Sequence, residues 1–204
     1  MANFNNKKSV WMSTKRIETL VDGVFAIALT LLVLNIDVPN IVGSVTDPVL
    51  WQYIVNLSQQ LWIYAFSFLL LSSFWRANHQ QFFFIKEADS NLIWITVLWL
   101  MFIALVPFST NFVSNYGSHS IPMFFFNLNM LIIGVFYILI WTYVSKKNYF
   151  YETVDKKQLK LINRINYILP IVALVAIGVT FVKPSWSPYS YFLIFILKMN
   201  IKRI

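Results

Sequence analysis

The chain has 204 residues, of which 58% are hydrophobic and 12% charged, and its formal net charge is +8. Soluble domains carry about twice that share of charge, so the composition predicts a polytopic membrane protein built as one compact helical unit. The chain has no cysteine and two histidines, His79 and His119. That excludes disulfides, thiol catalysis, iron–sulfur clusters and cysteine-rich or histidine-rich metal centres.

The first apolar run follows basic residues, as it does in a signal peptide. The run is about 20 residues long, enough to cross a bilayer, and no small-x-small cleavage site follows it. We therefore expect a retained first span.

The hydropathy pattern predicts an all-α membrane protein with six transmembrane helices. A hydrocarbon core of about 30 Å requires about 20 helical residues. Six apolar segments reach or approach that length: about 17–36, 50–74, 92–112, 121–144, 165–182 and the shortest, 189–200. The second helix is expected to continue through the polar stretch 75–84, and residues 145–164 to form a surface loop with a short amphipathic helix.

The basic residues predict the orientation. With six spans, 15 of the 16 lysines and arginines fall on one side of the membrane, and Lys183 falls on the other with Asp37 and Asp47. We expect both termini to lie in the cytoplasm and the membrane to be a bacterial plasma membrane. Contact of the basic loops with anionic lipid headgroups accounts for the net charge without nucleic acid.

The first span has an apolar stripe on one face. At about 100° per residue, Leu31 lies about 40° and Leu34 about −20° from Ile27, with Thr30 beside them at about −60°. Leu20 continues the stripe inward. A stripe of this kind can face lipid, pack against a neighbour or line a pore.

Charged residues near the start of the span lie on other faces. Asp22 points about 140° away from Ile27 and Glu18 nearly opposite to it, whereas Arg16 falls on the stripe near its cytoplasmic end. Acidic residues within a membrane usually face other helices, so Glu18 and Asp22 are expected to face neighbouring helices.

Three stretches closely resemble a known family. Residues 16–34, RIETLVDGVFAIALTLLVL, are similar to the first helix of prokaryotic members of the endosomal and lysosomal potassium channel family, transmembrane protein 175. Residues 74–82, FWRANHQQF, resemble its tryptophan–histidine segment, and residues 98–110, LWLMFIALVPFST, its third helix. The resemblance covers roughly the first 115 residues. Members carry an Arg-x-x-x-Phe-Ser-Asp motif, in which Arg16 and Asp22 match the ends but Leu20 and Val21 replace phenylalanine and serine.

The resemblance implies a potassium-selective or potassium-preferring ion channel without a TVGYG filter. It implies a homotetramer in which the first helix of each subunit lines a central pore. Ile27, Leu31 and Leu34 would form a hydrophobic constriction, and Thr30 would assist selectivity beside it unless its hydroxyl bonds to its own helix. No resident cofactor or metal is expected, and monovalent cations, K⁺ above all, are the permeant ions.

Trp75 and His79 are spaced i, i+4 and share one helix face. With Asp22 or Arg16 they are expected to form a polar cluster that supports the pore helix. The favoured interpretation is a structural hydrogen-bond network that holds the pore helix in place, and a pH response through the histidine is the alternative.

Three other functions are alternatives to the channel. An intramembrane enzyme would need a nucleophile with a base or paired acids, and the spans beyond the first contain no acidic residue. A secondary transporter of a cation or small solute often has broken helices in matching positions, for which Pro107 and Pro170 are a weak sign. A purely structural protein would tolerate polar substitutions in the stripe.

Overall fold

The computed structural model describes residues 13–36 and 45–203, and these are almost entirely helical. The elements follow in the order α1 (Thr14–Leu31), η1 (Leu32–Asn35), α2 (Asp47–Asn56), α3 (Ser58–Phe82), α4 (Ser90–Ala104), α5 (Val106–Tyr116), α6 (Ser120–Lys147), α7 (Lys156–Asn166), α8 (Ile168–Val182), η2 (Pro184–Phe192) and α9 (Leu193–Arg203), where η1 and η2 are 3₁₀ helices. Lys7, Lys8 and Asp37, which enter the predicted charge asymmetry, lie outside the described residues.

The all-α membrane architecture is confirmed. Among the described residues, four helical segments are long and apolar enough to cross a bilayer, namely Thr14–Asn35, Ser90–Tyr116, Ser120–Lys147 and Lys156–Val182. They correspond to the first, third, fourth and fifth predicted spans. In the third, the helix breaks at Leu105, because Pro107 follows at the start of α5 and cannot donate a backbone hydrogen bond.

The second predicted span is bent rather than straight. It consists of α2 and α3, which meet at an angle of 45° at Leu57. If this pair counts as one span, the described residues contain up to five. The predicted continuation of the second helix through the polar stretch is confirmed as far as Phe82, the last residue of α3.

The carboxyl-terminal part differs most from the sequence-based expectation. The amphipathic helix expected in the surface loop is α7, and it leads into α8 with one break at Tyr167. The sixth predicted span falls on the end of η2 and on α9, whose 11 residues extend about 16 Å at 1.5 Å per residue. A sixth crossing therefore stays a prediction.

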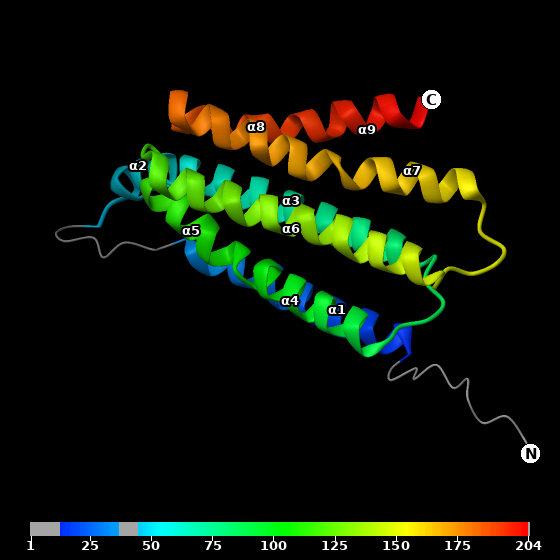
Figure 1. The fold of residues 1–204 in the computed structure, drawn as a ribbon. Coiled ribbons are helices and arrows are strands. Elements are labelled where there is room, and N and C mark those ends of the chain that lie inside the picture. Colours follow the sequence, from blue (N-terminus) through cyan, green and yellow to red (C-terminus); the bar gives the residue numbers. More distant parts are fainter. Residues whose placement is uncertain (1–12, 37–44, 204) are drawn as a thin grey trace, which may run out of the picture.

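The long helices lie side by side in three layers (Figure 1). The first layer holds α1 with α4 and α5, the second α3 with α6, and the third α7 and α8 with α9. The layers are joined because α1 packs against α3 and α4, and α6 packs against α4, α5 and, most extensively, α8. This arrangement leaves α1 at an edge of the molecule.

Aromatic side chains join the first two layers. Phe25 on α1 lies 5.6 Å, between ring centroids, from Trp99 on α4, which lies 5.3 Å from Tyr137 on α6. The Tyr137 hydroxyl donates a hydrogen bond of 2.6 Å to the carbonyl of Phe74 on α3. These four residues are at most 4% exposed, so they hold α1 against the centre of the helical bundle.

Helices α6 and α8 approach closely at Gly134. A Cβ atom there would lie 2.8 Å from the ring of Pro170. Small residues permit this approach in membrane proteins, where helix association depends on close packing and interhelical hydrogen bonds.

Polar side chains join α6 to its neighbours. Asn127 donates to Thr180 at 2.9 Å and to Ser187 at 2.7 Å, and it accepts a hydrogen bond of 2.8 Å from the Tyr191 hydroxyl. Asn129 donates to the carbonyl of Phe102 on α4 at 3.2 Å. The first set ties α8 and η2 to α6.

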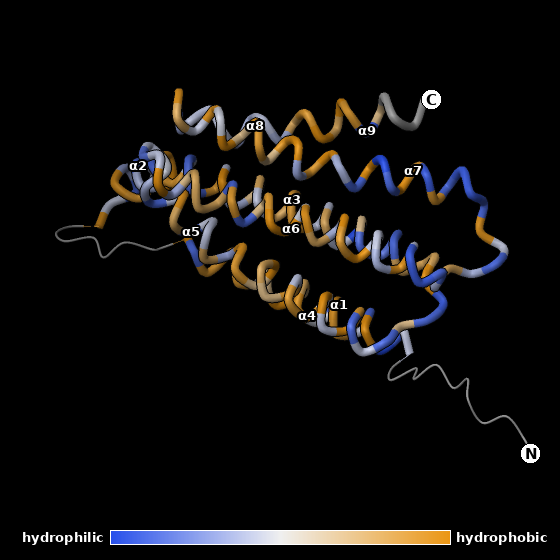
Figure 2. The backbone as a smooth tube through the Cα atoms, viewed as in Figure 1, coloured by the Kyte–Doolittle hydropathy of each residue, from blue (hydrophilic) through white to orange (hydrophobic). Residues whose placement is uncertain are grey.

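The hydrophilic segments gather at one end of the molecule. Figure 2 shows α7 and the adjoining ends of α3 and α6 there, and Figure 1 places the start of α1 and the end of α9 at the same end. The basic residues of α6 and α7, including Lys146, Lys147, Lys156 and Lys157, belong to it. The predicted clustering of positive charge at one membrane face agrees with this arrangement for the described residues.

Candidate pore-lining helix and its supports

Helix α1 has one buried and one uncovered apolar face. The buried residues follow a spacing of three or four, as on one side of a helix: Ile17, Val21, Phe25, Ala28 and Leu32. Across from them, Ile27 is 62% exposed, Leu31 41% and Leu34 71%. In the most apolar 18-residue stretch of this span, 28% of the residues are buried. In the corresponding stretches of the other three candidate spans, 44% to 50% are buried. In the single chain, the predicted stripe is therefore open to lipid or to another copy of the chain.

Thr30 lies beside the stripe and bonds to its own helix. Its hydroxyl donates to the carbonyls of Ala26 at 3.1 Å and Ile27 at 2.8 Å. This is the alternative that the sequence left open for this residue. The oxygen of the exposed hydroxyl retains a lone pair that can accept a further hydrogen bond.

Asp22, Trp75 and His79 come together as expected. The indole Nε1 of Trp75 on α3 donates a hydrogen bond of 2.8 Å to Oδ1 of Asp22 on α1. The His79 ring stacks on the Trp75 ring, with centroids 6.1 Å apart and planes inclined by 24°. All three side chains are exposed in the single chain, so the contact joins α1 to α3 at the surface.

Arg16 does not take part in this cluster. Its side chain is exposed, and no ion pair joins it to Asp22 among the residues that the structure describes. Glu18 is half-buried at an open cavity of about 470 Å³ between the start of α1, the end of α3 and residues 151–158. Val21, which replaces the motif's serine, is 1% exposed and packs in the core.

The Leu34 end of the stripe has a polar anchor that the sequence did not predict. Asn35, the last residue of η1, donates through Nδ2 to the carbonyl of Pro107 at 2.9 Å. Asn111 on α5 donates to Oδ1 of Asn35 at 3.1 Å and accepts a hydrogen bond from Asn115. The sequence did contain a sign of this anchor: asparagines occur in apolar segments near the proline break, and such amides often join helices in a membrane.

At the opposite end of the molecule, Asp89 caps α4 and is the centre of a second polar cluster that the sequence did not predict, here called the Asp89 node. Its Oδ2 accepts hydrogen bonds from the hydroxyls of Tyr143 at 2.6 Å and Tyr149 at 3.2 Å, and its Oδ1 accepts from the Leu92 N–H at 2.9 Å. Burial acts to raise the pKa of Asp89, but these hydrogen bonds and the charge of Lys147 outweigh it, so its pKa lies below the ordinary value of 3.8. The node fixes the connection after α3 against the end of α6.

Tyr149 has the complementary shift. Burial, followed by the negative charge of Asp89, raises the pKa of Tyr149 to about 12. Its backbone carbonyl also accepts a hydrogen bond of 2.7 Å from the Lys86 N–H. No pattern in the sequence indicated this contact, because Asp89 is 54 positions from Tyr143 and 60 positions from Tyr149 along the chain.

The described residues contain no group of three or more histidine, aspartate or glutamate side chains that could hold a metal ion. The candidate functional feature is therefore the uncovered apolar stripe, which polar contacts hold in place at both ends.

Comparisons with known proteins agree with this architecture. The family model of the endosomal/lysosomal potassium channel TMEM175 matches residues 16–107. A potassium channel of Streptomyces collinus is 30% identical over 142 residues, which are 67% of this chain and 67% of that protein. A potassium channel of a Chryseobacterium species is 23% identical over 164 residues, which are 78% of this chain and 82% of that protein.

The fold also has a solved counterpart. The crystal structure of a lysosomal potassium-selective channel TMEM175 homolog from Chamaesiphon minutus matches with a TM-score of 0.73 at 24% identity, over 93% of this chain and 96% of that chain. At this identity the structural match shows the fold alone. Since the Streptomyces relative is 30% identical across two thirds of both proteins and the family model matches the first helices, the chain belongs to the endosomal/lysosomal potassium channel TMEM175 family.

Proposed function

We propose that four copies of the chain form a homotetramer that conducts K⁺ through a central pore lined by α1. The observation that carries this proposal is the apolar stripe of α1, which its own subunit leaves uncovered at Ile27, Leu31 and Leu34. Four such stripes meeting around an axis would form a hydrophobic constriction. The relatives named above are ion channels and not enzymes.

A ring of isoleucine and leucine side chains can gate ions without a lid. A narrow apolar constriction expels water and blocks ions, and a modest widening lets water return. K⁺ holds its hydration shell less tightly than Na⁺, so partial dehydration at the constriction favours K⁺. Without a carbonyl filter the selectivity is modest, and Thr30, beside the constriction, is the one nearby hydroxyl on this helix that could assist it.

The polar contacts at the two ends of α1 would hold the stripe towards the axis. Asp22 and Trp75, with His79 stacked behind, tie α1 to α3 near its start. Asn35 ties the end of η1 to α5. Arg16 lies on the stripe side at the pore entrance, where a basic residue would meet permeating ions.

The orientation proposed places both termini in the cytoplasm of a bacterial cell. The described basic residues of α6, α7 and α9 then lie at the inner leaflet, where anionic headgroups attract them. The tetramer would hold no cofactor, and its ions would pass through transiently.

The test is K⁺ flux from liposomes for the wild type and Ile27→Asn, with Leu139→Asn as a control. Leu139 on α6 is 48% exposed, so the control carries the same polar change on another uncovered helix face. We expect Ile27→Asn to leak more and to discriminate K⁺ from Na⁺ less, and the control to behave as the wild type. Unchanged flux in Ile27→Asn would remove Ile27 from the constriction, and flux that requires a coupling ion would identify a transporter.

A further inference from the structure

A small cavity lies where α3, α6 and the junction between α7 and α8 meet. It encloses about 30 Å³, and both polar and apolar atoms line it. Its wall includes Ser73 and Ala77 of α3, Tyr137 of α6 and Asn166, the last residue of α7. A buried site needs about 10–15 Å³ of this volume to hold one water molecule. The cavity therefore has room for one or two waters and excludes any larger molecule.

Asn166 brings an unpaired hydrogen-bond donor to this cavity. The residue is 7% exposed, and its Oδ1 accepts a hydrogen bond of 2.8 Å from Nε2 of Gln81 on α3. Its Nδ2 has no hydrogen-bond partner within the part of the chain that the structure describes. A buried donor without a partner costs free energy, so a bound acceptor at this position would stabilise the folded chain.

Another buried asparagine of the same bundle is satisfied by protein groups alone. Asn127 on α6 is 1% exposed. Its Nδ2 donates to Thr180 and Ser187, and its Oδ1 accepts from the Tyr191 hydroxyl. The fold thus pairs both polar side-chain atoms of Asn127, whereas at Asn166 the adjoining cavity is the place where a partner for Nδ2 can lie.

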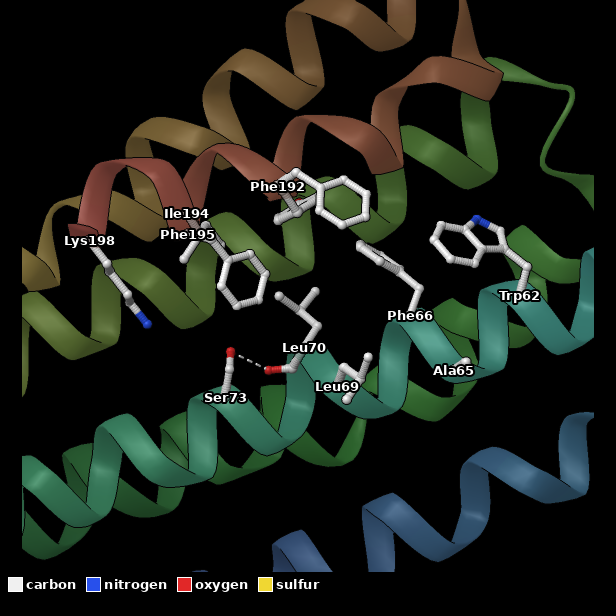
Figure 3. A pocket seen from close by; sticks show the side chains of 11 residues that line it. Trp62, Ala65, Phe66, Leu69, Leu70, Ser73, Phe192, Ile194, Phe195 and Lys198 are labelled. Carbon is white, nitrogen blue, oxygen red and sulfur yellow. Dashed lines mark hydrogen bonds between the residues drawn. The ribbon is translucent and has the colours of Figure 1, made fainter. Parts of the chain in front are cut away.

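The cavity also supplies acceptors. The Tyr137 hydroxyl donates to the carbonyl of Phe74 at 2.6 Å. The Ser73 hydroxyl donates to the carbonyl of Leu70 at 2.7 Å, as Figure 3 shows beside the larger apolar groove between α3 and α9 that Ser73 also lines. Each hydroxyl oxygen keeps a lone pair that can accept a further hydrogen bond. One donor and two acceptors match a buried water, which typically makes about three hydrogen bonds.

An ion would use this set of groups less well than water. The Nδ2 of Asn166 presents hydrogens, which repel a cation, and the positive charge of Lys198, which also lines the cavity, opposes a cation as well. An anion needs several donors, but the protons of both hydroxyls are already bonded to carbonyls. A neutral molecule that both accepts and donates uses all three groups.

We propose that the cavity binds a water molecule that accepts a hydrogen bond from Asn166 and donates to Tyr137 and Ser73. This water would join the end of α7 to α3 and α6 next to the break at Tyr167. Ordered waters satisfy polar groups at helix breaks in membrane proteins. The proposal goes beyond conduction and does not require the pore arrangement, because none of these residues belongs to α1.

The first test is water-edited solid-state NMR of the protein in liposomes, with ¹⁵N-labelled asparagine. The experiment measures how fast magnetisation passes from water protons to each side-chain amide. We expect fast transfer to Asn166 and slow transfer to Asn127, the internal control, because protein groups alone pair the Asn127 amide. Transfer to Asn166 that is as slow as transfer to Asn127 would overturn the proposal.

Filling the cavity should displace the water. Ala77→Val adds two methyl groups at the cavity wall, and Ala65→Val makes the same change at an exposed position of the same helix. We expect Ala77→Val to slow the transfer to Asn166 to the rate of Asn127, and Ala65→Val to leave it fast. Fast transfer in folded Ala77→Val would show that the amide exchanges with bulk water, and it would refute a bound water.

A second test needs no variant. In a high-resolution density map of the wild type, we expect a peak about 2.5–3.2 Å from Nδ2 of Asn166 and from the hydroxyl oxygens of Tyr137 and Ser73. A cavity without density, in a map that resolves other buried waters, would contradict the proposal. An anomalous signal at the site after Rb⁺ replaces K⁺, or after Br⁻ replaces Cl⁻, would assign an ion there and would also exclude the water.

Discussion

The indole Nε1 of Trp75 lies 2.8 Å from Oδ1 of Asp22, and this hydrogen bond joins α3 to α1 across 53 positions of the chain. Asp22 directly follows Val21 and lies about one helical turn before Phe25, and both of these apolar residues pack in the core. The carboxylate therefore fixes the rotation of α1 about its own axis, from a side of the helix that makes no apolar core contacts.

We expect Trp75→Phe to weaken this contact, because phenylalanine keeps the aromatic ring and removes the donor. The loss should be about 1 kcal/mol of unfolding free energy in detergent, below the range for buried hydrogen bonds to charged groups because the pair is exposed. Asp22→Asn, which removes the charge of the acceptor, should reduce tetramer assembly or K⁺ flux. Trp94→Phe, at an exposed tryptophan of α4, is the control. If neither Asp22→Asn nor Trp75→Phe alters assembly or flux, the pair does not support the pore helix.

The close approach of α6 to α8 predicts opposite outcomes for two glycines. Gly134→Ala places a methyl group 2.8 Å from the Pro170 ring, whereas a Cβ at Gly178 would have no atom within 4 Å apart from its chain neighbours and the backbone of its own helix. Overpacking of this kind costs about 1–3 kcal/mol, so Gly134→Ala should lower the thermal midpoint in detergent and Gly178→Ala should not. Equal midpoints for both variants would show that α8 can shift away from α6 at little cost.

The contact between Asn35 and Asn111 predicts energetic coupling between η1 and α5. A double-mutant cycle of Asn35→Ala and Asn111→Ala should give a coupling of about 0.6 kcal/mol, the average for interhelical polar contacts in a membrane protein. Pairing Asn35→Ala with Asn56→Ala, an exposed residue of α2, should give additive effects. Additive effects in the first pair would contradict the proposed anchor.

Asp89 predicts a loss of stability in acid. Its pKa is lower in the folded chain than the ordinary value of 3.8, so the folded state favours the charged form. Its contribution is present above about pH 4 and is lost as the pH falls through the folded pKa. Asp89→Asn should reduce the acid dependence of the unfolding free energy, whereas Asp155→Asn, an exposed cap of α7, should not. If the acid dependence of the unfolding free energy is unchanged in Asp89→Asn, other carboxylates cause the loss of stability in acid.

Tyr149 predicts a loss of stability in base. Its folded pKa is about 12, and the unfolded value is about 10, so the folded state favours the protonated phenol. The contribution is complete below about pH 10 and is lost as the pH rises through about 12. Tyr149→Phe should flatten the unfolding free energy between these values, and Tyr151→Phe, at an exposed tyrosine, should not. Matching alkaline profiles of Tyr149→Phe and the wild type would exclude Tyr149 as the cause.

The apolar runs were sufficient to predict four of the spans, because hydropathy and helix length are properties of consecutive residues. The two faces of α1 were also predictable, since helical periodicity assigns Ile27, Leu31 and Leu34 to one side. The spacing of Trp75 and His79 likewise placed both rings on one face of α3. Local regularities of this kind need no knowledge of the partners.

The tertiary structure decided the contacts between distant positions. The bend at Leu57, the Asn35–Pro107 hydrogen bond across 72 positions and the Asp89 node depend on which helices become neighbours, and no local pattern specifies that. The groove between α3 and α9 arises for the same reason, because its two walls are more than 100 residues apart in the chain. Consecutive residues determine which segments enter the membrane, and the packing of those segments determines which side chains meet.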